Sequence, residues 1–144
     1  MTSPSQLCRI HSALVFAIAV FSVSAPGVSA QSTDLFDQVD HRYADSDGVR
    51  IHYAVLNESS PDAPLVVMVH GFPDFWYTWR DQMTALAGAG YRVAAMDTRG
   101  YNLSDQPETV DAYSLDNLVS DVAAVIGAEG EERAIVVGHD WGGW

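Results

Sequence analysis

The stretch AIVVGHDWGGW, residues 134–144, decides the fold of this chain. Its apolar first half leads directly into GHDWG, in which Gly138 and Gly142 flank Asp140. The pattern Gly-x-nucleophile-x-Gly is typical of a sharp strand-to-helix turn that lifts the central side chain above a sheet. Glycines are expected at both flanking positions because side chains there would clash across the turn. The alternative interpretation is that Asp140 caps a helix starting at Gly142.

Three apolar runs, separated by other patterns, predict the strands of a sheet. Each is continuous and rich in small or β-branched residues, as in strands that are buried on both faces. The runs are LVVMVH at 65–70, YRVAAMD at 91–97 and RAIVVGH at 133–139. An Asp47-Gly48 pair between two further extended stretches predicts a hairpin before them.

The segments between these runs predict helices. Residues 75–90 place Trp79 and Met83 on one apolar face and end at glycines. From residue 115 onward, leucine and valine again recur at helical spacing, and Ser114 is positioned to cap this second helix. The order of hairpin, strand, helix, strand, helix, strand predicts an α/β fold with a mostly parallel sheet and flanking helices.

Composition excludes several classes of protein. The 144 residues fit one domain, and 48% hydrophobic with 18% charged residues is not a disordered composition. The formal net charge is −12, and all seven basic residues are Arg and are scattered. An acidic chain without basic clusters is a poor candidate for binding nucleic acid or anionic membranes. The patterns indicate no specific oligomeric state.

Residues 1–30 have the features of a signal peptide. They contain no Asp or Glu, and Arg9 precedes an apolar stretch that is too short to span a bilayer. Val28-Ser29-Ala30 follows as a small-residue cleavage site, so we expect cleavage after Ala30 and export of residues 31–144. An uncleaved anchor is the alternative. Cys8 would leave with the signal, so no disulfide is expected in the mature part.

Three loops are expected to converge on one ligand site. HGFPDFW, DTRGYNLSD and GHDWGG each follow a predicted strand, and ligands of open α/β sheets bind beyond the carboxyl ends of the strands. Two backbone N–H groups, those of Phe72 and Trp141, would form an oxyanion hole beside Asp140. Pro73 fixes the first loop and suggests a cis peptide bond.

The histidines and the polar residues of the second loop are expected to serve the structure. We expect His70, next to Gly71, to bond loop backbone rather than to act as a base, and His139 to point away from the turn. Asp97, Arg99 and Ser104 are expected to hold their own loop through local hydrogen bonds. No paired Cys/His or HExxH spacing predicts a metal site.

HGFPDFWYTWR, DTRGYNLSD and VVGHDWGG together resemble the α/β-hydrolase superfamily and, within it, the epoxide hydrolases. The resemblance covers about residues 36–144. It implies that Asp140 attacks an epoxide carbon to form an ester, that Phe72 and Trp141 supply the oxyanion donors, and that no cofactor takes part. It also implies a lid with two tyrosines, a catalytic histidine and its acid partner. These would lie beyond Trp144, so residues 31–144 are expected to be the N-terminal part of the domain, inactive alone.

The choice of aspartate favours an electrophilic sp³ carbon. A carboxylate is ionised at neutral pH and forms an ester that water can hydrolyse, whereas serine would form a stable ether with an epoxide. Haloalkane and haloacid dehalogenases use the same logic and are the first alternative. Phe72, in place of the Asn common in haloalkane dehalogenases, and Trp141, in place of the Arg of fluoroacetate-type enzymes, favour an epoxide, although Trp141 alone decides nothing because haloalkane dehalogenases also have Trp there. The second alternative is a non-catalytic binding module built on this fold.

Overall fold

The computed structural model describes residues 34–56 and 62–144. The expected signal peptide, residues 1–30, lies outside the described residues. A short 3-10 helix, η1 (Leu35–Asp37), opens the described part and precedes the first strand.

The hairpin forms where the Asp-Gly pair predicted it. Strands β1 (Asp40–Ser46) and β2 (Val49–Leu56) run antiparallel, and the pair Ser46↔Val49 closes the ladder. Both turn residues adopt left-handed backbone, with φ of 51° at Asp47 and 82° at Gly48. This combination matches the twist of a two-residue hairpin, which explains why the sequence signal is reliable.

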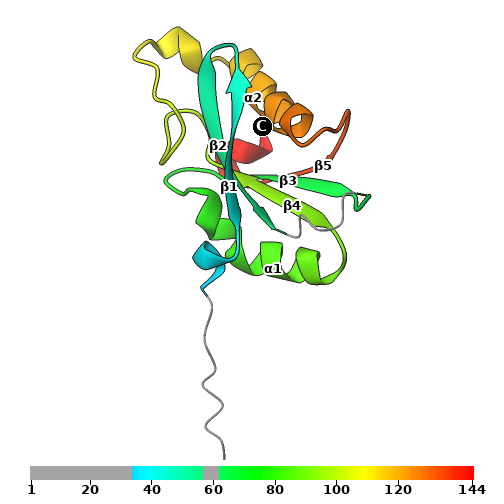
Figure 1. The fold of residues 1–144 in the computed structure, drawn as a ribbon. Helices are drawn as coiled ribbons and strands as arrows, with labels where there is room; N and C mark the ends of the chain where they lie inside the picture. Colours follow the sequence, from blue (N-terminus) through cyan, green and yellow to red (C-terminus); the bar gives the residue numbers. More distant parts are fainter. Residues whose placement is uncertain (1–33, 57–61) are drawn as a thin grey trace, which may run out of the picture. The chain divides into compact units, whose positions relative to one another are not determined.

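The three later strands are parallel and end at one edge of the sheet. They are β3 (Leu65–Val69), β4 (Arg92–Met96) and β5 (Ile135–Gly138), and the strand order is β1-β2-β4-β3-β5 (Figure 1). Strand β2 meets β4 antiparallel, so the sheet is mixed. In register, Val69 pairs with both Met96 and Gly138. The loops that follow these strands therefore leave from adjacent points.

Two helices pack on opposite faces of the sheet (Figure 1). Helix α1 (Arg80–Gly88) follows η2 (Trp76–Trp79), so the predicted helix begins as a 3-10 turn. Helix α2 (Leu115–Ala128) follows η3 (Val110–Tyr113) and is capped as predicted, since Ser114 Oγ accepts the Asn117 N–H at 3.4 Å. The cap satisfies one of the backbone donors that a helix start leaves unpaired.

Alternating residues of the inner strands divide the core into two layers. Along β3, Leu65, Val67 and Val69 face α2, whereas Val66 and Met68 face α1. All five are buried, which explains the continuous apolar run in the sequence. The layer under α1 also holds Trp76, Trp79 and Met83, as expected for Trp79 and Met83 from their helical spacing.

The expectation that β5 is buried on both faces is wrong for the described residues. Ile135 is 49% exposed and Val136 is 51% exposed. Among the described strands, β5 pairs only with β3 and forms the edge of the sheet, which leaves one side of it without a neighbour. The apolar run identified a strand correctly but did not indicate that its side chains are partly exposed.

The loop after β4 is held partly as predicted. Asp97 accepts hydrogen bonds from Asn102 Nδ2 at 2.8 Å, and Ser104 Oγ donates to the Asp97 carbonyl at 2.7 Å. Both residues are buried. These local bonds confirm part of the sequence interpretation. Both residues also bond other elements, because Asp97 lies 2.7 Å from His52 Nδ1 and accepts the Trp76 N–H at 2.8 Å, and Ser104 Oγ accepts the His52 N–H at 2.8 Å.

Arg99 corrects the expectation of a purely local role. Its Nε and Nη2 atoms donate to the two carboxylate oxygens of Asp121 at 2.7 and 2.5 Å, and Nη1 donates to the Ala112 carbonyl at 2.7 Å. Asp121 lies within α2, and both side chains are buried. A buried bidentate pair of this kind ties the loop after β4 to the middle of α2, and the bond to Ala112 ties it to η3. Local spacing gave no sign of a partner on another element.

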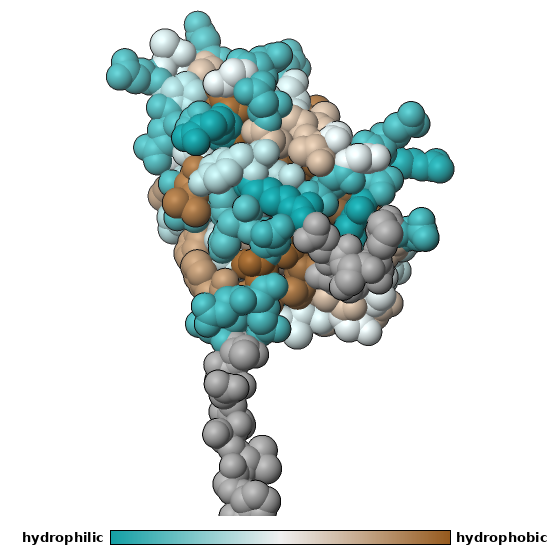
Figure 2. All heavy atoms as spheres, in the orientation of Figure 1, coloured by the Kyte–Doolittle hydropathy of each residue, from teal (hydrophilic) through white to brown (hydrophobic). Residues whose placement is uncertain are grey.

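The face of the molecule in Figure 2 is mostly hydrophilic, with hydrophobic residues in separate groups. This agrees with the high count of acidic side chains in the sequence. Within residues 34–56 and 62–144, none of the helices has the length and apolar character needed to cross a membrane.

Candidate active site

Asp140 occupies a sharp turn directly after β5. Strand β5 ends at Gly138, His139 is extended, and η4 (Asp140–Gly143) begins at once. Asp140 has a φ of 55°, a left-handed backbone that is uncommon for a residue with a side chain. The strained turn predicted from the sequence is therefore present. Asp140 is its central residue rather than a cap for a helix starting at Gly142.

The glycines around the turn are required by close backbone approaches. A Cβ atom on Gly138 would overlap the Gly142 carbonyl, and one on Gly142 would overlap the Val69 carbonyl. Gly71 is restricted by the aspartate itself, because an added Cβ would stand 2.6 Å from Asp140 Oδ1. This confirms the clash predicted for Gly138 and Gly142. It also gives the reason for glycine at position 71, which the sequence motif did not explain.

Two backbone N–H groups converge on the Asp140 carboxylate. The Phe72 N–H donates to Asp140 Oδ1 at 3.0 Å, across a separation of 68 residues. The Trp141 N–H, on the next residue, also stabilises the charged form of this carboxylate. The bond from Trp141, followed by that from Phe72, lowers the pKa of Asp140 below its ordinary value. The side chain is exposed and is ionised at neutral pH. These are the two donors that the sequence suggested for an oxyanion hole.

His70 bonds backbone on both sides of its ring. Its Nδ1 atom lies 2.8 Å from the Gly71 carbonyl oxygen, and the Thr98 N–H donates to Nε2 at 3.0 Å. The side chain is 1% exposed. With both nitrogens occupied, it serves the loop structure, as expected, and has no free nitrogen to act as a base. The neighbouring Phe72–Pro73 peptide bond is cis, in line with the sequence suggestion.

His139 contributes through its backbone. Its N–H donates to the Val69 carbonyl at 3.2 Å, which continues the pairing of β5 with β3 by one residue. Its carbonyl accepts the Gly142 N–H at 3.0 Å, which closes the turn around Asp140. The residue therefore helps to fix the elbow.

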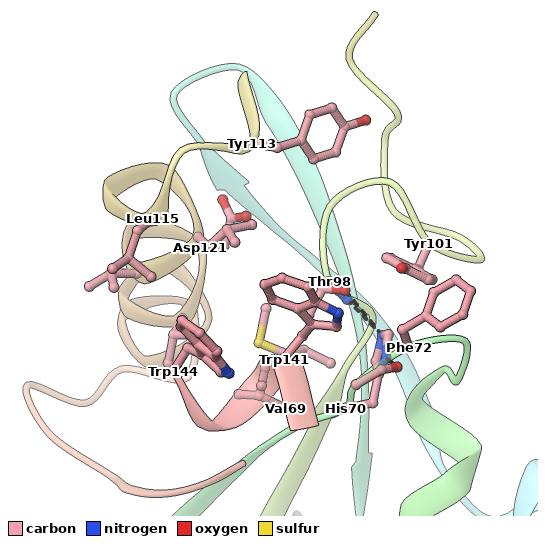
Figure 3. A pocket seen from close by; sticks show the side chains of 16 residues that line it. Val69, His70, Phe72, Thr98, Tyr101, Tyr113, Leu115, Asp121, Trp141 and Trp144 are labelled. Atoms are coloured by element: carbon pink, nitrogen blue, oxygen red, sulfur yellow. Dashed lines mark hydrogen bonds between the residues drawn. The ribbon is translucent and has the colours of Figure 1, made fainter. Parts of the chain in front are cut away.

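A pocket of about 300 Å³ opens beside the turn (Figure 3). The loops that follow β3, β4 and β5 each contribute residues to the lining, as predicted from the three loop motifs. Further lining residues come from η3 and α2. The lining is mainly apolar and aromatic. It consists of Val69, His70, Gly71, Phe72, Met96, Thr98, Tyr101, Tyr113, Leu115, Leu118, Val119, Asp121, Val122, Trp141, Gly142 and Trp144.

Sequence reasoning missed the wall that α2 provides. The apolar stripe of this helix was expected to pack on the core, yet Leu115 is 56% exposed and Val119 is 57% exposed, and both line the pocket. No sequence signal marked this wall, because the spacing of the stripe does not show that, of these positions, only Val125 is fully buried. In contrast, Trp76 and Trp79 lie in the core and do not line the pocket.

No arrangement of ligand side chains suited to a metal ion occurs in the described part of the chain. Within it, no group of three or more His, Cys, Asp or Glu side chains is close enough to hold one ion.

Comparison with known proteins gives the same family from sequence and from structure. A family model described as "alpha/beta hydrolase fold" matches residues 64–144. The AB hydrolase superfamily protein YfhM of Bacillus subtilis is 48% identical over 107 residues, which cover 74% of this chain and 37% of that protein. Epoxide hydrolase B of Mycobacterium tuberculosis is 50% identical over 102 residues, which cover 71% of this chain and 29% of that protein.

Solved structures agree with these relatives. An epoxide hydrolase from an endophytic Streptomyces superposes with a TM-score of 0.68 at 51% identity, over 73% of this chain and 30% of that one. Epoxide hydrolase VrEH1 from Vigna radiata gives a TM-score of 0.67 at 38% identity, over 74% and 33%. The chain thus spans about a third of the length of the proteins it matches. With its Gly-x-Asp-x-Gly turn, its loop arrangement and the match over residues 64–144, this chain belongs to the alpha/beta hydrolase fold family.

Proposed function

We propose that the full-length protein is an epoxide hydrolase that opens an epoxide to a diol through an ester on Asp140. The observation that carries this proposal is the ionised Asp140 carboxylate, held in a strained elbow by the N–H groups of Phe72 and Trp141. Relatives at about half identity that are named epoxide hydrolases support it.

In the first step, one carboxylate oxygen of Asp140 attacks a carbon of the epoxide. The bond between that carbon and the ring oxygen breaks, and the ring oxygen takes up a proton from a tyrosine of the lid that the resemblance implies, becoming a hydroxyl group. The product is an ester between Asp140 and the opened substrate. An aspartate suits this step because it is already ionised and needs no base. The lowered pKa of Asp140 keeps it ionised in mildly acidic solution as well.

In the second step, water attacks the carbonyl carbon of the ester. The carbonyl oxygen becomes an oxyanion, which the N–H groups of Phe72 and Trp141 are placed to stabilise. Collapse of this intermediate breaks the bond to the alcohol oxygen, releases the diol and restores the carboxylate. The resemblance to epoxide hydrolases implies a histidine paired with an acid as the base that activates the water. His70 cannot take this role because both of its nitrogens are engaged.

The pocket supports a substrate with an apolar substituent. Its wall carries Leu115, Val119 and Trp141, and few polar side chains reach it. A small apolar cavity with a few placed polar groups is the usual form of a small-molecule site. Dehalogenation is less favoured, because the exposed side chain of Phe72 offers no hydrogen-bond donor for a departing halide. A binding module without catalysis is the remaining alternative.

We also propose that the protein is exported after cleavage of residues 1–30. The support is the order of Arg9, an apolar stretch and Val28-Ser29-Ala30 in the sequence.

Replacing the nucleophile tests the proposed reaction. With Asp140→Asn in the full-length protein, we expect no ester and a fall in turnover of at least about 10⁴-fold, because an amide is a poor nucleophile. The measurements are the rate of diol formation from styrene oxide and the mass of the peptide that contains residue 140 after rapid acid quench. Asp116→Asn, at an exposed carboxylate outside the pocket, is the matched control and should keep parental turnover. Near-parental turnover in Asp140→Asn would remove this residue from the mechanism.

Gly71→Ala tests the close approach of the two loops. The added Cβ overlaps Asp140, so the carboxylate or the Phe72 N–H has to move, and we expect kcat/KM to fall by about 100-fold or more. Gly127→Ala on α2 adds the same methyl group where no atom lies within 4 Å and should leave kcat/KM unchanged. Equal values of kcat/KM in both variants would show that the tight contact at position 71 does not affect catalysis.

The export proposal predicts the N-terminus of the mature protein. The protein recovered from outside the cytoplasm of its source should begin at Gln31, and this is read by the mass of its N-terminal peptide. Ala30→Arg, which places a large charged residue at the cleavage site, should leave the leader attached. Recovery of uncleaved protein from the cytoplasm alone would contradict the proposal.

A further inference from the structure

We propose that His70 is a positioning residue, which orients the Gly71–Phe72 peptide so that the Phe72 N–H points at Asp140. This inference rests on the proposed function for its kinetic consequence but stands on geometry that is independent of it. The chain of contacts runs from Thr98 through the imidazole ring to the Gly71 carbonyl, and from the Phe72 N–H to the carboxylate.

The two ends of one peptide unit are held by different partners. The Gly71 carbonyl and the Phe72 N–H belong to the same planar group, and in a trans unit they point in opposite directions. His70 Nδ1 bonds the carbonyl end at 2.8 Å, and Asp140 Oδ1 accepts from the N–H end at 3.0 Å. The Asp74 N–H also donates to this carbonyl at 2.9 Å, but it belongs to the turn of the same loop. Of the two described partners of this carbonyl, His70 is the one that also contacts the loop after β4, through Thr98.

The donors assign a single protonation state to the ring. The Thr98 N–H can only donate, so Nε2 accepts it and carries no proton, and the Thr98 hydroxyl, 3.3 Å from Nε2, is then a second donor to the same nitrogen. The proton of the neutral ring is then on Nδ1, where it donates to the Gly71 carbonyl. A ring protonated on both nitrogens would set two donors against each other at Thr98. The bridging form of His70 is therefore the neutral ring with its proton on Nδ1.

Gly71 is the reason that such a support is needed. Glycine is required there, because a Cβ atom would collide with Asp140. Glycine is also the residue with the greatest backbone freedom, so the peptide that carries the Phe72 N–H has little stiffness of its own. The neighbouring imidazole supplies the missing constraint from a fixed position. It is 1% exposed and packs against the edge of the Tyr101 ring, with 5.2 Å between the ring centroids (Figure 3).

Loss of this orientation should affect the two chemical steps unequally. In ester formation, the carboxylate loses negative charge as it attacks, so a weaker bond from Phe72 does little harm. In ester hydrolysis, an oxyanion develops on the carbonyl oxygen, and a misdirected donor slows its formation. A variant with a misdirected Phe72 N–H should therefore accumulate the ester on Asp140.

Two matched substitutions separate positioning from simple packing. His70→Asn keeps a side-chain N–H near the Nδ1 position for the Gly71 carbonyl but does not reach Thr98. His70→Gln places a carbonyl oxygen near the Nε2 position for the Thr98 N–H but leaves the Gly71 carbonyl without its donor. Both remove the ring and fill part of its space, so a purely structural role predicts similar losses in the two variants.

The experiment measures ester formation and ester hydrolysis separately, in single turnovers of styrene oxide by the full-length protein. For His70→Gln we expect hydrolysis to slow by about 10²-fold, with ester formation changed far less, since loss of one oxyanion donor has an effect of this size. His70→Asn should stay within about 10-fold of the parent. Equal hydrolysis rates in the two variants would overturn the inference. Absence of an ester in the parent would instead refute the proposed function.

A second measurement does not depend on activity or on the folding of a variant. In the parent protein, nitrogen NMR of His70 should show the proton on Nδ1 and a bare Nε2 at neutral pH. The Phe72 amide should exchange slowly with solvent, as expected for a donor held on a carboxylate. A proton on Nε2, or a doubly protonated ring, would contradict the bridge between Thr98 and Gly71 and overturn the inference.

Discussion

The bond from the Phe72 N–H to the Asp140 carboxylate is the contact on which the site depends. It joins two loops that are 68 residues apart in sequence, at a distance of 3.0 Å. The parallel pairing of β3 with β5 makes this possible, because Val69 and Gly138 end their strands side by side. A carboxylate held by two backbone donors is aimed and ionised before a substrate arrives. Such preorganisation is what stabilises charge in a transition state.

Holding the carboxylate in place imposes requirements on the residues around it. The left-handed backbone of Asp140 is held by the closely packed turn around it. That packing requires glycine at positions 138 and 142, where a Cβ would overlap backbone carbonyls. Glycine at position 71 leaves room for the Asp140 carboxylate, but it also makes the backbone at this position more flexible. In our proposal, the buried ring of His70 restores its stiffness from the β4 side. The motif residues therefore act as one unit rather than as separate features.

Much of this arrangement could be predicted from sequence, because it depends on local rules. The Asp47-Gly48 hairpin, the Ser114 cap and the elbow at Asp140 each have a short pattern with a direct steric or hydrogen-bonding cause. Features that depend on which element lies beside which were missed. The pairing of Arg99 with Asp121 needs the position of α2 over the loop, and no spacing within either segment encodes it. The exposure of β5 and the pocket wall on α2 were missed for the same reason.

The central claim, that a carboxylate oxygen of Asp140 becomes an oxygen of the product, is tested most directly by oxygen isotopes. A single turnover of styrene oxide by the full-length protein in ¹⁸O-labelled water is analysed by mass spectrometry of the diol and of the peptide containing Asp140. If water attacks the ester carbonyl, the diol keeps an unlabelled oxygen from Asp140 and the label appears in the Asp140 carboxylate. A labelled diol with an unlabelled Asp140 would mean that water attacks the epoxide directly, and would contradict the account.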